Sequence, residues 1–226
     1  GDSILTLYLT LDLDRQYFSN IANAHFFYTP FKTGLSSLDS SALMPPANQS
    51  DGKPYTSDRQ VILDWLKQYY RQTTFEISCP VIRDERLAPE GKTGLIVSTL
   101  FDYPLAKHIA DMGWYDEFKA FSARAILDVL DETVYPGLKD KVMDQFVSTP
   151  LTLEKRTGNT DGAITGWAFT NNPVPVVHSM PKIAQSVRTP IPDVYQAGQW
   201  VFSPSGLPIS ILTGKLAADQ IIKKLK

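Results

Sequence analysis

Near the start of the chain, leucine occupies every second position from Leu5 to Leu13, and mostly polar residues stand between the leucines. Successive side chains of a strand point to opposite sides, so a period of two places all the leucines on one face. This pattern predicts a half-buried strand whose leucine face turns toward a core. Shorter apolar runs predict further strands at 25–29, 75–79 and 94–101.

Apolar residues at helical spacing predict three longer helices. The first has Thr56 or Ser57 as its N-cap, and its apolar face carries Val61, Ile62, Trp65, Leu66 and Tyr69. The second runs from about 114 to 133 and ends before a Pro-Gly pair. The third runs from about 208 to 225, with one side formed by Ile211, Gly214, Ala218, Ile222 and Leu225. Strands interleaved with helices predict an α+β fold with a mixed sheet and helices on one side.

Composition excludes several classes of protein. The 226 residues include 22 basic and 24 acidic side chains, a formal net charge of −2. We therefore expect no nucleic-acid partner, because such binding needs a basic face. A single cysteine excludes an intrachain disulfide, and no apolar run approaches the roughly 20 residues of a membrane-spanning helix. These features favour a soluble protein of a reducing compartment, the cytoplasm.

Residue types that often carry catalysis or bind metals do not form a recognisable motif. His25, His108 and His178 are far apart in the sequence and lack the spacing of metal ligands. Cys79 has no basic neighbour in the sequence that would activate a thiolate, which favours a packing role. The G-x-S-x-G, G-x-G-x-x-G and G-x-x-x-x-G-K-[ST] motifs are absent. Their absence disfavours a serine hydrolase and the ordinary dinucleotide or nucleotide sites.

The segment 189–214, TPIPDVYQAGQWVFSPSGLPISILTG, is the most distinctive part of the sequence. It predicts a short strand that ends at Gly198, then a loop rich in Pro, Gly and Ser, then a helix with Pro208 in its first turn. A helix N-terminus offers unpaired backbone N–H groups and a partial positive charge. Such a place stabilises an anion or an electron-rich ring.

This segment resembles the carboxy-terminal part of flavin-dependent oxidoreductases of the phytoene desaturase and retinol saturase type, within the amine-oxidase-like group. In that family a strand of the form L-Y-x-A-G-[DQ] is followed by P-G-G-G-x-P and a helix. The resemblance implies that Gly198 and Gln199 contact the ribityl–pyrophosphate region of FAD. It also implies that Gly206, Leu207 and Pro208 lie beside the isoalloxazine ring.

The resemblance extends upstream through the segments 7–12, 79–92, 135–138, 148–150 and 162–166, which follow the family's order. Two positions depart from the pattern. Gln199 stands where most members of the wider group have an acidic residue, and Ser205 replaces a glycine.

The family also has an initial strand, a G-x-G-x-x-G turn and a helix that hold the adenosine diphosphate of FAD, and this sequence has no such motif. The resemblance therefore implies a truncated chain, in which 1–185 form a substrate-binding domain and 186–226 complete an FAD-binding domain. The complete protein would move hydride between flavin N5 and an apolar, isoprenoid or carotenoid, substrate. The fragment alone would be inactive and would hold FAD weakly or not at all. No catalytic residue is assigned.

Two other functions stay open. One is a non-catalytic module that binds an apolar ligand or a partner chain. The other is an amine-oxidising flavoenzyme, in which Trp167 and Trp200 would form the aromatic pair beside the flavin. A substrate that dissolves in lipid also predicts peripheral membrane contact. The candidate contact surface is the segment 97–115, through Phe101, Tyr103, Ile109 and Trp114.

Overall fold

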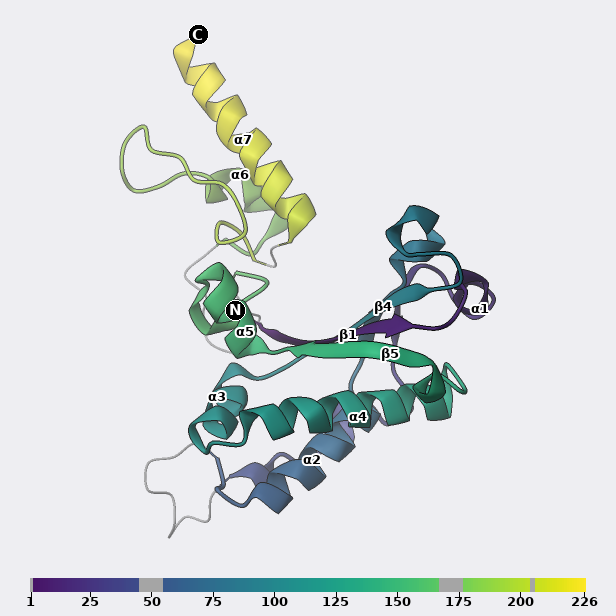
Figure 1. The fold of residues 1–226 in the computed structure, drawn as a ribbon. Helices are drawn as coiled ribbons and strands as arrows, with labels where there is room; N and C mark the ends of the chain where they lie inside the picture. Colours follow the sequence, from purple (N-terminus) through teal and green to yellow (C-terminus); the bar gives the residue numbers. More distant parts are fainter. Residues whose placement is uncertain (1, 45–54, 167–176, 204–205) are drawn as a thin grey trace. The chain divides into compact units, whose positions relative to one another are not determined.

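The structure is a computed structural model and describes residues 2–44, 55–166, 177–203 and 206–226. The chain divides into two compact units. The larger unit is Ile4–Thr152, and the smaller unit is Leu153–Lys226 together with the first residues of the chain. Figure 1 shows the elements of both. The expected division into a substrate-binding domain, 1–185, and the final part of an FAD-binding domain, 186–226, stays a prediction.

A five-stranded sheet in the order β2-β3-β4-β1-β5 forms the centre of the larger unit. The strands are β1 (Ile4–Leu11), β2 (His25–Tyr28), β3 (Phe75–Ser78), β4 (Thr93–Leu100) and β5 (Val142–Ser148). The α+β fold is confirmed. The sheet is antiparallel at every pairing of these strands, where a mixed sheet was expected. Strands β2, β3 and β4 follow one another in the chain and are neighbours in the sheet, which favours antiparallel pairing.

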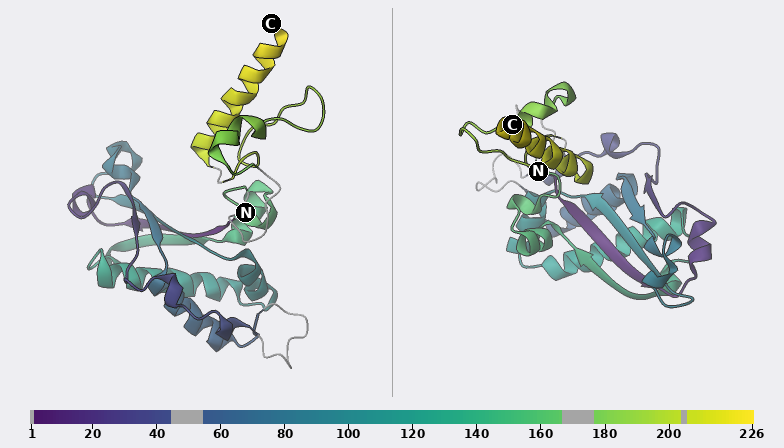
Figure 2. Two further views of the ribbon diagram at one scale, coloured as in Figure 1. Left: turned by 180° about the vertical axis from the view of Figure 1, so that it is seen from behind. Right: turned by 90° about the horizontal axis from the view of Figure 1, so that it is seen from above.

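Helices α2 (Arg59–Gln72), α3 (Tyr103–Asp111) and α4 (Tyr115–Thr133) cover one face of this sheet, while α1 (Arg15–Ser19) lies at one end (Figures 1 and 2). The N-cap of α2 is Asp58, so the prediction of Thr56 or Ser57 was wrong. The Asp58 carboxylate accepts backbone N–H bonds from Gln60 at 2.9 Å and Val61 at 3.3 Å. These bonds satisfy two donors that a helix start otherwise leaves open.

The core of the larger unit lies between the sheet and these helices. Leu5, Leu7 and Leu11 of β1 are fully buried and Leu9 is nearly so, which confirms the half-buried strand. Phe118 of α4 is also fully buried and packs in the same cluster. The period-two pattern of the first strand therefore identified the core face of the sheet.

The segment 97–115 does not form the membrane-contacting surface that we expected. Phe101 and Trp114 are each 5% exposed and Ile109 is fully buried. Phe101 directly follows β4, Ile109 lies on α3 and Trp114 precedes α4, and these elements turn all three side chains into the core. Among the described helices, none is long and apolar enough to cross a membrane.

The smaller unit contains α6 (Ile183–Ser186) and α7 (Leu207–Leu225), and α5 (Pro150–Thr157) enters it from the larger unit. Its small core is formed by Val187, Val201 and Ala217. The expected apolar side of α7 is not its packing side, because Ile211 is 66% and Leu225 is 82% exposed. The helix packs instead through Thr213, Leu216 and Ala217.

The strand expected to end at Gly198 is absent from the described residues. Tyr195 forms a single isolated bridge with Arg188, and Phe202 forms another with Val177. A strand needs a continuous ladder of backbone hydrogen bonds with a neighbour, and one bridge does not supply it. The segment is therefore a turn that leads into α7.

Candidate functional site

A hydrogen bond to the side chain of Thr213 links the turn at Gly198 to α7. The Gly198 N–H donates to Thr213 Oγ1 at 3.1 Å, and its carbonyl accepts the N–H of Val201 at 3.3 Å. Thr213 is fully buried and donates its own hydroxyl to the Ile209 carbonyl at 2.9 Å. Gly198 has φ of 109°, a conformation that L side chains rarely adopt. The structure thus places the turn at Gly198 against α7.

The start of α7 has the geometry expected from its sequence. Gly206 is the N-cap residue, has φ of 152°, and provides no side-chain cap. Its carbonyl accepts the Ser210 N–H at 2.9 Å. Leu207 is 76% exposed, and Pro208 lies in the first turn, where its missing N–H costs little. The helix start is therefore exposed at the residues assigned to the flavin ring.

The backbone at both glycines leaves room for a bound group. A Cβ added at Gly198 would meet nothing within 4 Å, and one at Gly206 would meet only Pro208 Cδ at 3.9 Å. The partial positive charge of a helix start suits the electron-rich isoalloxazine ring, and the open glycine backbone at Gly198 allows close approach of the ribityl–pyrophosphate region. The described residues therefore fit FAD chemically, although each individual contact stays a prediction. Trp200 is 37% exposed, and Trp167 lies outside the described residues, so the aromatic pair is not placed.

A second candidate surface is the face of the sheet opposite α2, α3 and α4. Tyr8 of β1 lies directly between Ile96 of β4 and Phe146 of β5. The rings of Tyr8 and Phe146 stack with centroids 4.4 Å apart and planes 9° from parallel. Phe146 is 59% exposed. We name Tyr8, Ile96 and Phe146 the aromatic strip.

Most of the residues beside the aromatic strip are uncharged. Thr6 lies two residues from Tyr8 on the same face, and its hydroxyl hydrogen-bonds to the Ser98 hydroxyl at 2.9 Å. Ser148 is paired with Thr6 on β5. The charged residues of this face are Asp144 on β5, which is paired with Thr10, and Glu76 on β3, which hydrogen-bonds to His25 at 2.8 Å. The centre of the face is therefore aromatic, with hydroxyls and one exposed carboxylate beside it, and this centre suits an apolar ligand.

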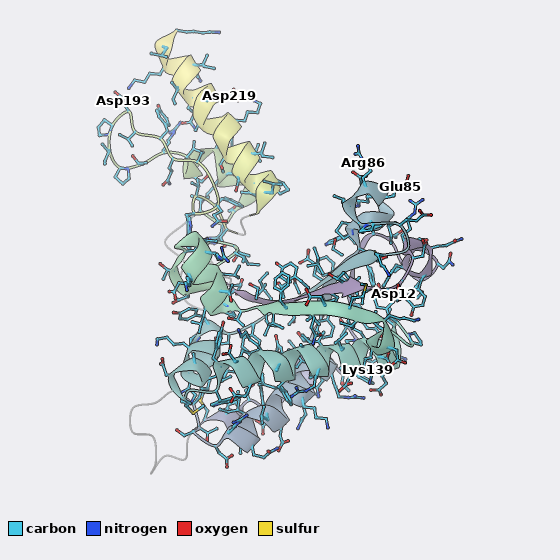
Figure 3. All side chains as sticks on the ribbon, in the orientation of Figure 1. Asp12, Glu85, Arg86, Lys139, Asp193 and Asp219 are labelled. Atoms are coloured by element: carbon cyan, nitrogen blue, oxygen red, sulfur yellow. The ribbon has the colours of Figure 1, made fainter. Side chains whose placement is uncertain are left out.

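A polar cavity of about 410 Å³ lies toward one end of the larger unit. Figure 3 labels Asp12, Glu85 and Arg86 at this end. Glu85 forms an ion pair with Arg15 at 2.7 Å, and Lys92 pairs with Asp12, which lowers the pKa of that carboxyl. Arg15 and Glu85 line the cavity and are paired with each other, Lys92 is paired with Asp12, and the lining also includes the carboxylates of Asp14 and Glu90. Such a lining does not suit an apolar substrate.

The histidines do not form a metal site. His108 is only 7% exposed, and its ring nitrogen Nε2 hydrogen-bonds to the Thr56 carbonyl at 2.9 Å. The helix α3 turns it inward, and the carbonyl satisfies its buried polar atom. No group of three or more His, Cys, Asp or Glu side chains within the described ranges could hold a metal ion.

Cys79 is expected to be unreactive in the folded chain. It is 2% exposed, and burial raises the pKa of its thiol to about 11, although a backbone hydrogen bond from Ile82 lowers it slightly. Little thiolate, the reactive form, exists at pH 8. We expect a thiol reagent such as DTNB to react about a hundredfold more slowly with the native chain than with the unfolded chain. Fast stoichiometric reaction of the native chain would contradict this expectation.

The same pKa shift gives the pH dependence that Cys79 adds to stability. The folded pKa lies above that of the unfolded thiol, so the folded state retains the proton over a range where the unfolded state loses it. The contribution is fully present below the ordinary thiol pKa and is lost as the pH rises toward about 11. Urea unfolding at pH 8 and pH 10, with Cys79→Ala for comparison, measures it.

Comparison with known proteins finds distant relatives of the chain. No protein-family model matches the chain. The 4,4'-diapophytoene desaturases (4,4'-diaponeurosporene-forming) of Staphylococcus aureus strains Newman, USA300 and NCTC 8325 are each 29% identical to it over 149 residues, or 65% of this chain. The match covers 28% of the length of each desaturase. The chain is thus a distant homologue of Staphylococcus aureus 4,4'-diapophytoene desaturase.

Proposed function

We propose that the chain is the substrate-binding portion of an FAD-dependent oxidoreductase of the desaturase type. The complete protein would act on an apolar substrate, isoprenoid or carotenoid, and the portion alone would be inactive. The observation that carries the proposal is the similarity to 4,4'-diapophytoene desaturase, which extends over 149 residues. The uncharged aromatic strip supports it, because a long hydrocarbon gains free energy by covering aromatic side chains.

Each candidate surface has a distinct part in the proposed reaction. Desaturation removes a hydride and a proton from adjacent carbons, and bound FAD supplies the hydride acceptor. In this chain Gly198 and Gln199, with the α7 start at 206–208, would hold FAD. Tyr8 and Phe146 would hold the hydrocarbon flat against the sheet and exclude water from it. Peripheral membrane contact belongs to the proposal, because the substrate must pass from lipid, but the buried side chains of 97–115 do not provide it.

Binding of a polyene alcohol tests the substrate part of the proposal. All-trans-retinol, followed by its own fluorescence, is expected to bind the native chain in a saturable manner. The double variant Tyr8→Ser with Phe146→Ser is expected to bind about tenfold more weakly, since two aromatic contact surfaces are lost. Phe27→Ser is the matched control, because Phe27 is an exposed aromatic residue of the same sheet, 68% exposed on β2. Equal affinity of the native chain and the double variant would contradict the assignment of the aromatic strip.

Titration with FAD, followed by the flavin absorption spectrum, tests the cofactor part. We expect weak binding, because the sequence lacks the G-x-G-x-x-G motif that anchors the adenosine diphosphate. Tight stoichiometric binding would mean that the chain builds a flavin site by another route. Retinol binding without any response to FAD, even in a longer chain that includes the nucleotide-binding motif, would favour a non-catalytic apolar-ligand module.

A further inference from the structure

A groove of about 220 Å³ lies between α2 and α4 in the larger unit. Its floor is formed by Phe121, Ala125 and Val129 of α4. These residues are spaced by four, so they form one line along the helix, about 12 Å long. The floor is apolar throughout.

The walls of the groove carry basic side chains from both helices. Lys67 and Arg71 come from α2, and Arg124 comes from α4. Arg71 is already engaged, because Glu132 accepts two hydrogen bonds from its guanidinium at 2.7 and 3.0 Å. This carboxylate raises the pKa of Arg71, and the guanidinium also lies 4.7 Å from the centre of the Phe31 ring. Arg71 is therefore a fixed and neutralised part of the wall.

The acidic residue of the groove is neutralised as well. Asp128 accepts a hydrogen bond from Lys139 Nζ at 2.9 Å, and Figure 3 shows Lys139 near the C-terminal end of α4. By contrast, neither Lys67 nor Arg124 makes an ion pair with any residue that the structure describes. Two positive charges on opposite walls thus remain without a counter-charge above an apolar floor. Their natural complement is an anion that is attached to an apolar chain.

We propose that this groove binds the anionic head of a single-chain amphiphile, a phosphate or a carboxylate, between Lys67 and Arg124. The first carbons of the chain would lie on Phe121, Ala125 and Val129. The volume supports a partial enclosure of this kind, because it is below the roughly 300–1,000 Å³ of pockets that enclose whole drug-sized ligands. This site is separate from the aromatic strip, so it does not depend on the proposed function.

The surface around the groove favours a free amphiphile over a lipid bilayer. Proteins that lie on a bilayer insert exposed apolar side chains between the lipid headgroups. No exposed large apolar side chain of the described residues belongs to α2 or α4. The groove can therefore receive one chain but has no apolar rim to enter a membrane.

Calorimetric titration with decyl phosphate, below its critical micelle concentration, tests the proposal. We expect saturable binding of one molecule, with inorganic phosphate and decanol each at least about tenfold weaker, because each lacks one half of the recognition. Higher ionic strength is expected to weaken the binding of decyl phosphate. Equal affinity for decyl phosphate and inorganic phosphate, or for decyl phosphate and decanol, would overturn the proposal. Binding to phosphatidylglycerol vesicles without binding to decyl phosphate would overturn it too.

Two variants and one control locate the site. The double variant Lys67→Gln with Arg124→Gln is expected to bind decyl phosphate about tenfold more weakly. Ala125→Phe fills the floor and is expected to abolish binding while the circular dichroism spectrum stays native. Lys155→Gln with Arg156→Gln removes the same charge from exposed positions of α5, outside the groove, and is expected to bind like the native chain. If the double variant and this control lose affinity for decyl phosphate equally, the binding depends on overall charge and not on a specific site, and the proposal is overturned.

Discussion

Phe118→Ala is expected to lower the free energy of unfolding of the larger unit by about 3–5 kcal/mol. The Phe118 ring is fully buried on α4, with centroids 5.5 Å from Phe101, 6.5 Å from Trp114 and 6.4 Å from Tyr115. Alanine would leave a cavity between Phe101, which follows β4, and the two rings at the start of α4, and rings attached at these fixed points cannot all move into it. Since domains are stable by about 5–15 kcal/mol, the loss would be a large part of the total.

Urea unfolding followed by circular dichroism measures this loss. Phe27→Ala is the matched control, because it removes the same ring from a position that is 68% exposed, where a change within about 0.5 kcal/mol is expected. Similar losses in the two variants would mean that Phe118 does not act through burial. A midpoint shift with an unchanged slope would show that the variant unfolds from the same compact state.

The sequence predicted those elements in which buried residues recur at a regular spacing within a single segment of the chain. In β1 the alternation of leucines is itself the pattern of burial, so both the strand and its core face were identified. Helix α4 was placed within one residue at its start, because Phe118 and the residues at helical spacing after it face the core together. The N-cap of α2 was missed by one residue or two, since Thr56, Ser57 and Asp58 are all good caps and the sequence alone does not rank their geometry.

Strand β5 and helix α3 were missed for different reasons. Strand β5 is an edge strand, with Met143 57% and Phe146 59% exposed, so its residues show no alternation of buried and exposed positions. Its existence depends on pairing with β1, which lies far away in the sequence. Helix α3 did have a local signal, because Asp102 caps it by accepting the Leu105 N–H at 3.0 Å and a proline follows in the first turn. Because this helix is short, its apolar residues were interpreted as part of an exposed surface.

The candidate sites were predictable only in part. The residues of the α7 start could be named from a short motif, since a proline in the first helical turn and an N-cap glycine are local features. The aromatic strip could not be named, because the pairing of Tyr8 with Phe146 follows from strand register across distant segments. The prediction of a strand before Gly198 was wrong. Apolar composition favours a strand, but it does not provide the neighbouring strand that the backbone hydrogen bonds need.

Thr213→Val is expected to release the Gly198 turn from α7. Valine has nearly the shape of threonine but has no hydroxyl, so the Gly198 N–H would lose its acceptor at 3.1 Å. Leaving a partly buried N–H unpaired costs about 1–2 kcal/mol. The apolar cluster around this turn is small and is formed by Val187, Val201 and Ala217. We expect the amide hydrogen of Gly198 to exchange about tenfold faster in the variant.

Thr213→Ser is the control, because serine keeps the hydroxyl and removes only a methyl group. Protection of the Gly198 amide in this variant is expected to stay close to the native value, although some packing against the small core is lost. Faster exchange in Thr213→Ser but not in Thr213→Val would show that the methyl group, and not the hydrogen bond, holds the turn. If Gly198 also contacts FAD as proposed, Thr213→Val should weaken FAD binding in a longer chain that includes the nucleotide-binding motif, and Thr213→Ser should not. If Thr213→Val releases the turn but leaves the FAD affinity unchanged, the role of the hydrogen bond is confirmed and the proposed contact of Gly198 with FAD is wrong.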